Sequence, residues 1–215
     1  MTPPRPPQRL YLLTPQLDDP QPFAPQLESA LGAADIAAVL LRLGNADERT
    51  LINRAKAIVP MVQRRDVAVL LDGRPELAAR AGADGAHLTG TAAFAAALAL
   101  LKPDRIAGAG GLASRHDAML AAETGADYVM FGEPDPPPRH PPRGGGRRPP
   151  LPDVLERLTW WADLFEVACV GYAASPDEVG ALAATGADFL ALGDWIWTEP
   201  KGAAAAVAAA AEFLR

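Results

Sequence analysis

The chain lacks most of what disulfide-linked, membrane-spanning and nucleic-acid-binding proteins need. One cysteine occurs among 215 residues, so no disulfide can form within the chain. No apolar run approaches the ~20 residues that span a bilayer. The net charge is −6 at pH 7, which argues against a general binder of nucleic acids or membrane surfaces. The proline-rich residues 1–8 lack the apolar core of a signal peptide and are expected to form a disordered tail, so a cytoplasmic protein is predicted.

Aromatic residues are also few, at 6%, whereas hydrophobic residues reach 49% and include many alanines. This composition suits small-residue helices that pack closely on a sheet. A length of 215 residues is enough for one domain with a sizeable core. The single cysteine, Cys169, lies in an apolar run and is expected to be a buried small hydrophobe.

A short phrase, Gly-Ala-Asp, occurs three times and organises the chain. Its copies end at Asp84, Asp127 and Asp188. Each copy ends an alanine-rich helical segment, places glycine where a helix C-cap favours positive φ, and opens a short apolar run. A helix–glycine–strand joint that repeats in this way predicts alternating strands and helices around a parallel sheet.

The spacing of the phrase indicates one regular array with one insertion. The second interval between these aspartates exceeds the first by 18 residues, which is the length of the Pro/Gly/Arg-rich stretch 133–150. That stretch has no hydrophobic period, so it is predicted to be a flexible loop insertion.

Hydrophobic patterning predicts eight strands, each followed by a helix. The predicted strands cover residues 9–14, 36–43, 67–71, 85–88, 105–109, 128–131, 166–170 and 189–192. The predicted helices include 23–31, 47–63, 91–101, 155–164 and 202–214, with capping boxes at Ser114 and Ser175. This series predicts a single (β/α)8 TIM-barrel domain over residues 9–215, with the loop insertion after the sixth strand. A doubly wound open sheet is the alternative.

In a TIM barrel the active site is built at the carboxyl ends of the strands. Arg42 ends an otherwise apolar strand, so it is a candidate to bind phosphate or pyrophosphate bidentately, with an ion pair to Asp72 as the alternative. Asp72 is a candidate metal ligand, or the turn residue of Asp-Gly. Glu133 follows the sixth strand as a candidate general acid or base, or as a solvated loop residue. His87, within the fourth strand, is either a satisfied structural group or an acid or base, and it is a candidate to bind the substrate or its phosphate.

Glycines mark the remaining candidate positions. In such barrels, backbone N–H groups after the last two strands often bind phosphate, which selects Gly171 and Gly193. Asp194, beside Gly193, would repel a phosphate unless a metal or an arginine lay between them. The fifth strand ends in glycines that leave room for a ligand or another backbone, namely Gly108, Gly110 and Gly111.

Two further groups of residues have alternative interpretations. Trp160–Trp161 and the pair Trp195 and Trp197 are interpreted as packing at the barrel exterior or rim, with a homodimer contact as the alternative. Arginines in the loop insertion are either a lid over an anionic ligand or part of a disordered linker. They are Arg139, Arg143, Arg147 and Arg148.

Motifs over most of the chain occur in the order of a known family. They are Leu10-Tyr-Leu-Leu-Thr14, Leu41-Arg42, Leu71-Asp-Gly-Arg-Pro-Glu-Leu-Ala78, Gly82-Ala-Asp-Gly-Ala-His-Leu88, Gly125-Ala-Asp-Tyr-Val-Met-Phe-Gly132 and Gly186-Ala-Asp188. With them the chain resembles the thiamine phosphate synthase family, which includes the related thiazole tautomerases. The resemblance implies a TIM barrel that joins hydroxymethylpyrimidine pyrophosphate to thiazole phosphate, with Mg²⁺ and loss of pyrophosphate. It also implies small phosphorylated thiamine-pathway ligands as partners.

The chain departs from the family pattern at polar positions. Of the polar residues in the family's Gln-Leu-Arg-Glu-Lys only Arg42 is kept, and the family's Asn-Asp-Arg is here Asp72-Gly-Arg, which moves or removes a metal carboxylate. Gly110 stands in place of a serine, and Glu133 in place of the histidine of the tautomerases. Three hypotheses follow: a synthase with weak, altered or lost activity, a tautomerase that uses Glu133 as base, and a non-catalytic barrel that binds a ligand or a partner.

Overall fold

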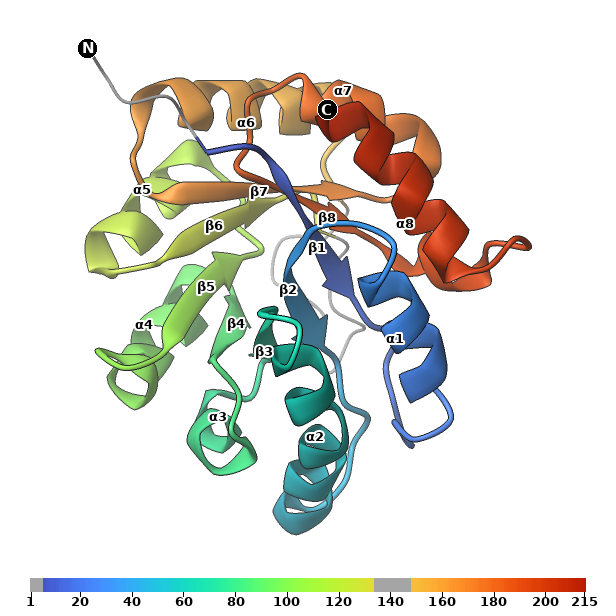
Figure 1. The fold of residues 1–215 in the computed structure, drawn as a ribbon. Coiled ribbons are helices and arrows are strands. Elements are labelled where there is room, and N and C mark those ends of the chain that lie inside the picture. Colours follow the sequence, from blue (N-terminus) through green and yellow to red (C-terminus); the bar gives the residue numbers. More distant parts are fainter. Residues whose placement is uncertain (1–5, 134–147) are drawn as a thin grey trace.

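The computed structural model describes residues 6–133 and 148–215, which form a closed barrel of parallel strands with helices on the outside (Figure 1). Each strand pairs with the next in sequence, and β8 pairs with β1 to close the ring. The strands are β1 (Arg9–Leu13), β2 (Ile36–Leu41), β3 (Ala68–Asp72), β4 (Gly85–Thr89), β5 (Ile106–Gly110), β6 (Tyr128–Phe131), β7 (Ala168–Ala173) and β8 (Phe189–Leu192). The predicted TIM barrel is confirmed, and the open-sheet alternative is wrong because this ring has no free edge.

Helices follow the strands around the ring and cover its outer face (Figure 1). They are α1 (Ala24–Leu31), α2 (Glu48–Gln63), α3 (Pro75–Ala81), α4 (Thr91–Leu101), α5 (Arg115–Thr124), α6 (Leu151–Leu164), α7 (Val179–Ala183) and α8 (Ala203–Ala211). The described residues also form short 3-10 segments, η1 (Pro176–Glu178), η2 (Asp194–Thr198) and η3 (Glu212–Leu214). Most of the predicted loop insertion, residues 134–147, lies outside the described residues, as do residues 1–5 of the predicted tail. Gln8, also in that predicted tail, donates to the carbonyls of Ala183 and Ala187.

The seventh strand and its following turn differ from the prediction. Strand β7 begins at Ala168 and runs to Ala173, so Gly171 lies within the sheet and not in a loop. Its neighbours on both sides, Phe131 and Leu190, keep it in register. Apolar patterning could not reveal this, because Gly171-Tyr-Ala breaks the apolar run without ending the hydrogen-bonded ladder.

The capping box at Ser114 is confirmed, whereas the one at Ser175 is wrong. Ser114 accepts from the backbone N–H of Asp117, whose side chain accepts from that of Ser114. Ser175 makes no side-chain cap. Glu178, which would complete its box, accepts instead from the backbone of Ala174 and pairs with Arg148. Because a hydrogen bond between two charged groups is stronger, the Glu178 carboxylate pairs with Arg148 and does not complete a capping box with Ser175.

Alternate residues of each strand enter two separate cores. On β1, Leu10 and Leu12 pack in the layer between strands and helices, whereas Tyr11 and Leu13 point into the barrel. Cys169 lies in the outer layer and is fully buried, as predicted. The interior of the barrel is therefore filled by side chains, and ligand chemistry is confined to its opening.

Each aspartate of the repeated phrase ties its strand to the preceding one. The Oδ2 atoms of Asp84, Asp127 and Asp188 accept from backbone N–H groups in β3, β5 and β7 at 2.7, 2.7 and 2.8 Å. The backbone N–H of each aspartate also donates to the carbonyl oxygen of the strand residue whose N–H its side chain accepts. These joints lie at the amino ends of the strands, opposite the ends where an active site is expected.

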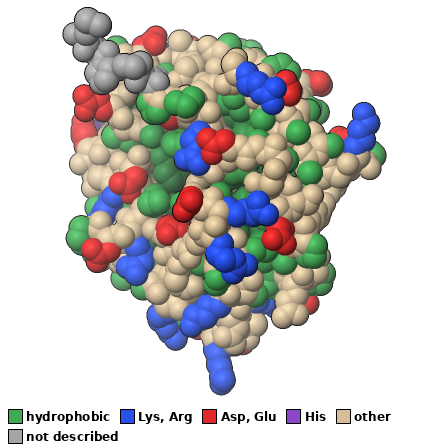
Figure 2. Space-filling view, in the orientation of Figure 1, with side chains coloured by type: hydrophobic (Ala, Val, Ile, Leu, Met, Phe, Trp, Pro, Cys, Tyr) green, Lys and Arg blue, Asp and Glu red, His purple; other side chains and the backbone are tan. Residues whose placement is uncertain are grey.

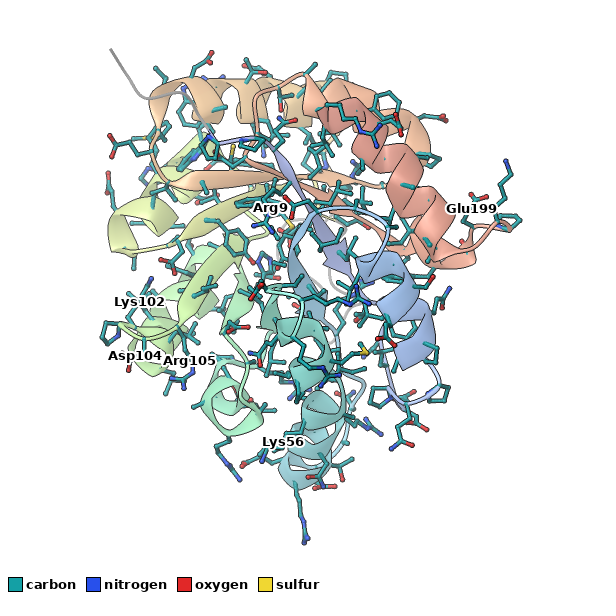
Figure 3. All side chains as sticks on the ribbon, viewed as in Figure 1. Arg9, Lys56, Lys102, Asp104, Arg105 and Glu199 are labelled. Carbon is teal, nitrogen blue, oxygen red and sulfur yellow. The ribbon has the colours of Figure 1, made fainter. Side chains whose placement is uncertain are left out.

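The outer surface carries mixed charge on the face seen in Figure 2, where acidic and basic side chains are interspersed with hydrophobic ones. Figure 3 labels several of these charged residues: Arg9, which pairs with Asp35, and a group at the turn between α4 and β5. That group includes Lys102, which pairs with Asp127. Among residues 6–133 and 148–215, no helix has the length and apolar character that a membrane crossing requires.

Candidate active site

The closed ring brings most of the predicted polar residues to one opening, at the carboxyl ends of the strands. They fall into two hydrogen-bonded groups. One group joins the ends of β1, β2 and β8, through Thr14, Arg42 and Asp194. The other joins β4, β5 and β6, through His87, Gly111 and Glu133.

Arg42 is held at the opening by two neighbouring strands. Its backbone N–H donates to Oγ1 of the fully buried Thr14 at 3.0 Å, and its Nε donates to the carbonyl oxygen of the same residue. Its Nη2 donates to Oδ1 of Asp194. The predicted ion pair with Asp72 is therefore wrong: Arg42 lies beyond the end of β2 and turns toward β1 and β8. Asp194 was expected to repel a phosphate unless a metal or an arginine lay between them, and Arg42 is an arginine in contact with Asp194.

His87 lies inside a chain of hydrogen bonds across the barrel, which we call the Tyr–His–Glu chain (Tyr11, Tyr128, His87 and Glu133). The hydroxyls of Tyr11 and Tyr128 are 3.0 Å apart, and Tyr128 Oη lies 2.8 Å from His87 Nδ1. His87 Nε2 lies 2.7 Å from Oε1 of Glu133. The imidazole ring also stacks on the Tyr128 ring, with centroids 5.6 Å apart. His87 is therefore a fully bonded buried residue that leads from the barrel interior to a carboxylate at the opening.

The charges around His87 favour its protonated form. Burial lowers the pKa of His87, but the charge and hydrogen bond of Glu133, together with the charge of Asp72, outweigh it and raise the pKa above its ordinary value of 6.5. Burial raises the pKa of Tyr11 and of Tyr128 above their ordinary value, so both hydroxyls stay neutral donors. Neither tyrosine stood out in the sequence, because a tyrosine in an apolar strand is typical of a core.

Glycines on β5 make room for this chain. A Cβ atom at Gly110 would lie 1.8 Å from Oε2 of Glu133, and one at Gly108 would lie 2.1 Å from Cζ of Tyr128. The backbone N–H of Gly111 donates to Oε2 of Glu133 at 2.8 Å. The glycines were expected to admit a ligand or another backbone, but they admit side chains of the site itself.

Glu133 lies at the opening, as predicted, and is not a solvated loop residue. Its side chain is 12% exposed and bonded at both oxygens. A carboxylate fixed by an imidazole and a backbone amide could accept or return a proton at the opening, so its role as acid or base stays a prediction.

Asp72 ends β3 next to this chain. Burial raises the pKa of Asp72, and the charge of Glu133 adds to the effect against the opposing charges of His87, Arg42 and Arg74. Among the described residues its carboxylate has no hydrogen-bond partner, and the charges of its neighbours act on it without a direct ion pair. The backbone N–H of Gly73, at φ 63°, donates to the His87 carbonyl, so the Asp-Gly turn is also present. Asp72 can therefore be the first residue of the turn and also offer its carboxylate to a cation.

The two glycines predicted to bind phosphate lie in different surroundings. A Cβ atom at Gly171 would lie 2.9 Å from Leu158 of α6, so Gly171 faces the outer helices. Gly193 lies beside Asp194 at the opening, and its N–H donates to the Ala173 carbonyl at 3.2 Å. Gly193 therefore adjoins the group that contains Arg42 through its neighbour Asp194, whereas Gly171 does not.

Arg148 is the one described member of the predicted basic cluster; Arg139, Arg143 and Arg147 lie outside the described residues, so the lid stays a prediction. Arg148 donates to both carboxylate oxygens of Glu178, at 2.8 and 2.7 Å, and to the carbonyl of Gly132 at 2.7 Å. These contacts join the ends of β6 and β7.

The tryptophans pack at the rim and exterior, as interpreted from the sequence. Trp195 and Trp197 of η2 donate their indole N–H groups to the carbonyls of Ala173 and Leu13, at 3.0 and 2.6 Å. They therefore cap the ends of β7 and β1 beside the opening. Trp161 is fully buried against Phe165 on the outer layer, and a dimer contact through Trp160 stays a prediction.

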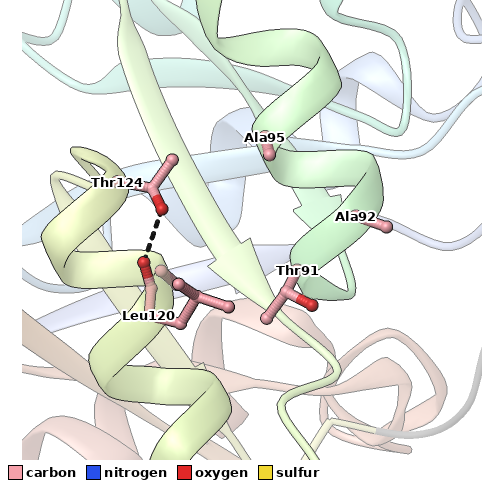
Figure 4. A pocket seen from close by; sticks show the side chains of 6 residues that line it. Thr91, Ala92, Ala95, Leu120 and Thr124 are labelled. Carbon is pink, nitrogen blue, oxygen red and sulfur yellow. Dashed lines mark hydrogen bonds between the residues drawn. The ribbon is translucent and has the colours of Figure 1, made fainter.

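A separate groove lies between α4 and α5 in the outer layer of helices (Figure 4). Its hydroxyls are those of two threonines, and one of them, Thr124, donates to the Leu120 carbonyl at 2.6 Å. No titratable group lines it, so it is not the candidate site. Its lining residues are Thr91, Ala92, Ala95, Leu120, Ala121 and Thr124.

Comparisons with known proteins bear on the family and the fold of the chain. The family model described as thiamine monophosphate synthase matches residues 10–196. A thiamine-phosphate synthase of Rhodospirillum centenum is 44% identical over 202 residues, covering 93% of this chain and 94% of that protein. One of Hyphomonas neptunium is 38% identical over 213 residues, covering 96% and 93%.

Among solved structures, a thiamine phosphate pyrophosphorylase of Pyrococcus furiosus matches with a TM-score of 0.76 at 22% identity, covering 96% of this chain and 95% of that one. A 3-hexulose-6-phosphate synthase matches with a TM-score of 0.68 at 15% identity, covering 96% and 100%. At these identities the structural likeness supports the fold alone.

Proposed function

Because the chain belongs to the thiamine monophosphate synthase family, we propose that it joins hydroxymethylpyrimidine pyrophosphate to thiazole phosphate and releases pyrophosphate. In this reaction the carbon–oxygen bond to pyrophosphate breaks, and the oxygen keeps the electron pair. A bond forms between the thiazole nitrogen and the pyrimidine methylene carbon. The protein's task is to bind both substrates and to stabilise the charge of the departing pyrophosphate.

The observation that carries the proposal is the placement of Arg42. Its guanidinium lies at the barrel opening with its Nε and backbone fixed by Thr14, and 19% of its side chain is exposed. A planar guanidinium binds two phosphate oxygens at once, which suits a pyrophosphate leaving group. Binding would require Arg42 to exchange the carboxylate of Asp194 for the ligand.

Asp72 is the residue that fits the Mg²⁺ implied by the family. Protein-bound Mg²⁺ is commonly held by one or two carboxylates together with substrate phosphates. Asp72 offers one such carboxylate without a hydrogen-bond or ion-pair partner among the described residues, although those residues contain no cluster of three metal-ligating side chains. When bound, the ion would neutralise charge on the leaving pyrophosphate. With a single carboxylate, affinity for the metal should depend on the pyrophosphate itself.

A second candidate function is thiazole tautomerisation with Glu133 as base. The 2.7 Å contact between Glu133 and His87 favours it, since a carboxylate backed by an imidazole is a common arrangement for moving a proton. This activity needs one substrate and no pyrophosphate, so substrate requirements separate the two functions.

The test is an assay of the purified protein with both phosphorylated substrates and Mg²⁺. Thiamine phosphate formation that falls at least about tenfold in Arg42→Ala supports the synthase, whereas no product above background with the unchanged protein contradicts it. A parallel assay with the thiazole carboxylate phosphate examines the tautomerase, for which Glu133→Gln should abolish the activity. If neither product forms, stabilisation of the protein against heat by these phosphates would leave the non-catalytic ligand-binding barrel.

A further inference from the structure

The barrel opening has two regions that suit different parts of a ligand. Arg42 lies where β1, β2 and β8 end and offers a guanidinium to an anion. Asp72 ends β3 and Glu133 follows β6, and the negative charge of Glu133 acts on Asp72. A Mg²⁺ ion held by Asp72 would remove the repulsion between Asp72 and a phosphate, but a phosphate placed directly beside Glu133 would be repelled, so the uncharged part of a ligand belongs next to Glu133.

Glu133 has fixed orientation and unused acceptor capacity. Its two oxygens each accept one hydrogen bond, from His87 Nε2 at 2.7 Å and from the Gly111 N–H at 2.8 Å. An ionised carboxylate has about four acceptor sites and no hydrogen to donate. Two sites therefore remain, and the ligand group that fits them is a hydrogen-bond donor, either N–H or O–H.

Of the two rings joined in the proposed reaction, only the pyrimidine carries N–H bonds, on its exocyclic amino group. We propose that Glu133 binds this amino group and that Gly110 is the positioning residue that lets the carboxylate reach it. This inference rests on the proposed function and names the residue that recognises one of its substrates. It places the aminopyrimidine toward β5 and β6 and the pyrophosphate toward Arg42.

Gly110 is required because any side chain there would occupy the place of the carboxylate. Its added Cβ atom would lie 1.8 Å from Oε2 of Glu133 and 2.5 Å from Nε2 of His87. These distances are far inside van der Waals contact, and both side chains are held in place, since His87 Nε2 is hydrogen-bonded to Oε1 of Glu133 and the Gly111 N–H donates to Oε2. A serine at position 110 and the observed glutamate at position 133 therefore exclude each other, so Gly110 and Glu133 form a matched pair.

The experiment is titration calorimetry with two unphosphorylated probes: 4-amino-5-hydroxymethyl-2-methylpyrimidine and the same compound with hydrogen in place of the amino group. The unchanged protein should bind the amino compound about tenfold more tightly, as expected for a hydrogen bond to a charged group. Glu133→Gln has the same shape but lacks the charge, and it should lose most of this preference. Gly110→Ala should lose it as well, through displacement of Glu133.

Inorganic pyrophosphate is the control probe, because its affinity should change by less than about twofold in Glu133→Gln. Equal binding of the two pyrimidines by the unchanged protein, no binding of the amino compound, or an intact preference in Glu133→Gln would each overturn the inference. If Gly110→Ala does not fold, Glu133→Gln decides alone. If the protein forms thiamine phosphate but shows no preference for the amino compound, this inference is rejected and the proposed function is kept. If it prefers the amino compound but forms no thiamine phosphate, the inference is kept and the proposed function is rejected.

Discussion

Asp194 accepts a hydrogen bond from Arg42, although the two residues are 152 positions apart in the chain. The arginine best placed to bind an anion is therefore already bound to a carboxylate of the protein. The pair is unequal in exposure, with 19% of the Arg42 side chain and 61% of the Asp194 side chain accessible. The exposed carboxylate can swing away while the guanidinium stays in place.

Asp194→Asn should therefore strengthen anion binding. The change removes a competitor and a repulsive charge, and an exposed ion pair is worth up to about 1 kcal/mol, so the Kd for inorganic pyrophosphate should fall by up to about fivefold. Calorimetric titration measures it, with Arg42→Lys as the control that weakens binding. A weaker pyrophosphate affinity in Asp194→Asn would mean that Asp194 positions Arg42 and does not compete with the ligand.

The raised pKa of His87 predicts a measurable titration. Its imidazole NMR signals should titrate above the ordinary value of 6.5 in the unchanged protein and at a lower pH in Glu133→Gln. Because the folded pKa is raised, the stability that protonated His87 contributes is complete below 6.5 and is lost as pH rises through the folded pKa. A His87 signal that titrates at the same pH in both proteins would contradict the coupling to Glu133.

Gly108→Ala should destabilise the protein by about 1–3 kcal/mol, because the new methyl group would overlap the ring of Tyr128. Urea unfolding gives the free energy. Tyr128→Val opens space beside position 108, so the double variant should be more stable than the sum of the two single effects predicts. Additive effects would mean that the two positions do not share this space.

The ion pair of Arg148 and Glu178 predicts a loss of stability in acid. Burial alone would raise the pKa of Glu178, but the hydrogen bonds from Arg148 and Ala174 and the charge of Arg148 lower it below its ordinary 4.5. Its contribution is present above 4.5 and is lost as pH falls through the folded pKa. Glu178→Gln should flatten this part of the profile of unfolding free energy against pH. An unchanged slope would show that other groups govern the acid transition.

Asp188→Ala should cost about 1–3 kcal/mol of unfolding free energy, since the backbone N–H of Cys169 loses an acceptor at 2.8 Å. Asp35→Ala is the matched control: its 71% exposed side chain pairs with Arg9 at the surface, so about 0–1 kcal/mol is expected. Urea unfolding compares the two. Activity per folded molecule should be unchanged in both variants, because neither residue lies at the opening.

Local patterns predicted the scaffold well. Strands β6 and β8 begin and end where the apolar runs do. Glu133 lies at the opening because it follows the carboxyl end of a barrel strand, and those ends line the opening. The pairing of Arg42 with Asp194 could not be predicted, since ring closure brings together residues from opposite ends of the chain. Tyr128 was missed because its hydroxyl has a partner only once β1 and β4 face it across the barrel.

The aspartate joints of the repeated phrase lie at the amino ends of the strands, at the opposite end of the ring from the opening. Substitutions at the opening therefore leave the joints intact, and the chain can change its polar residues there while it keeps a stable architecture. Because the joints and the opening lie at different ends, residues at the opening can be substituted one at a time, and the specificity can change while the fold stays stable. Gly110 and Glu133, two neighbouring residues at the opening, are positions where such a change would leave the joints intact.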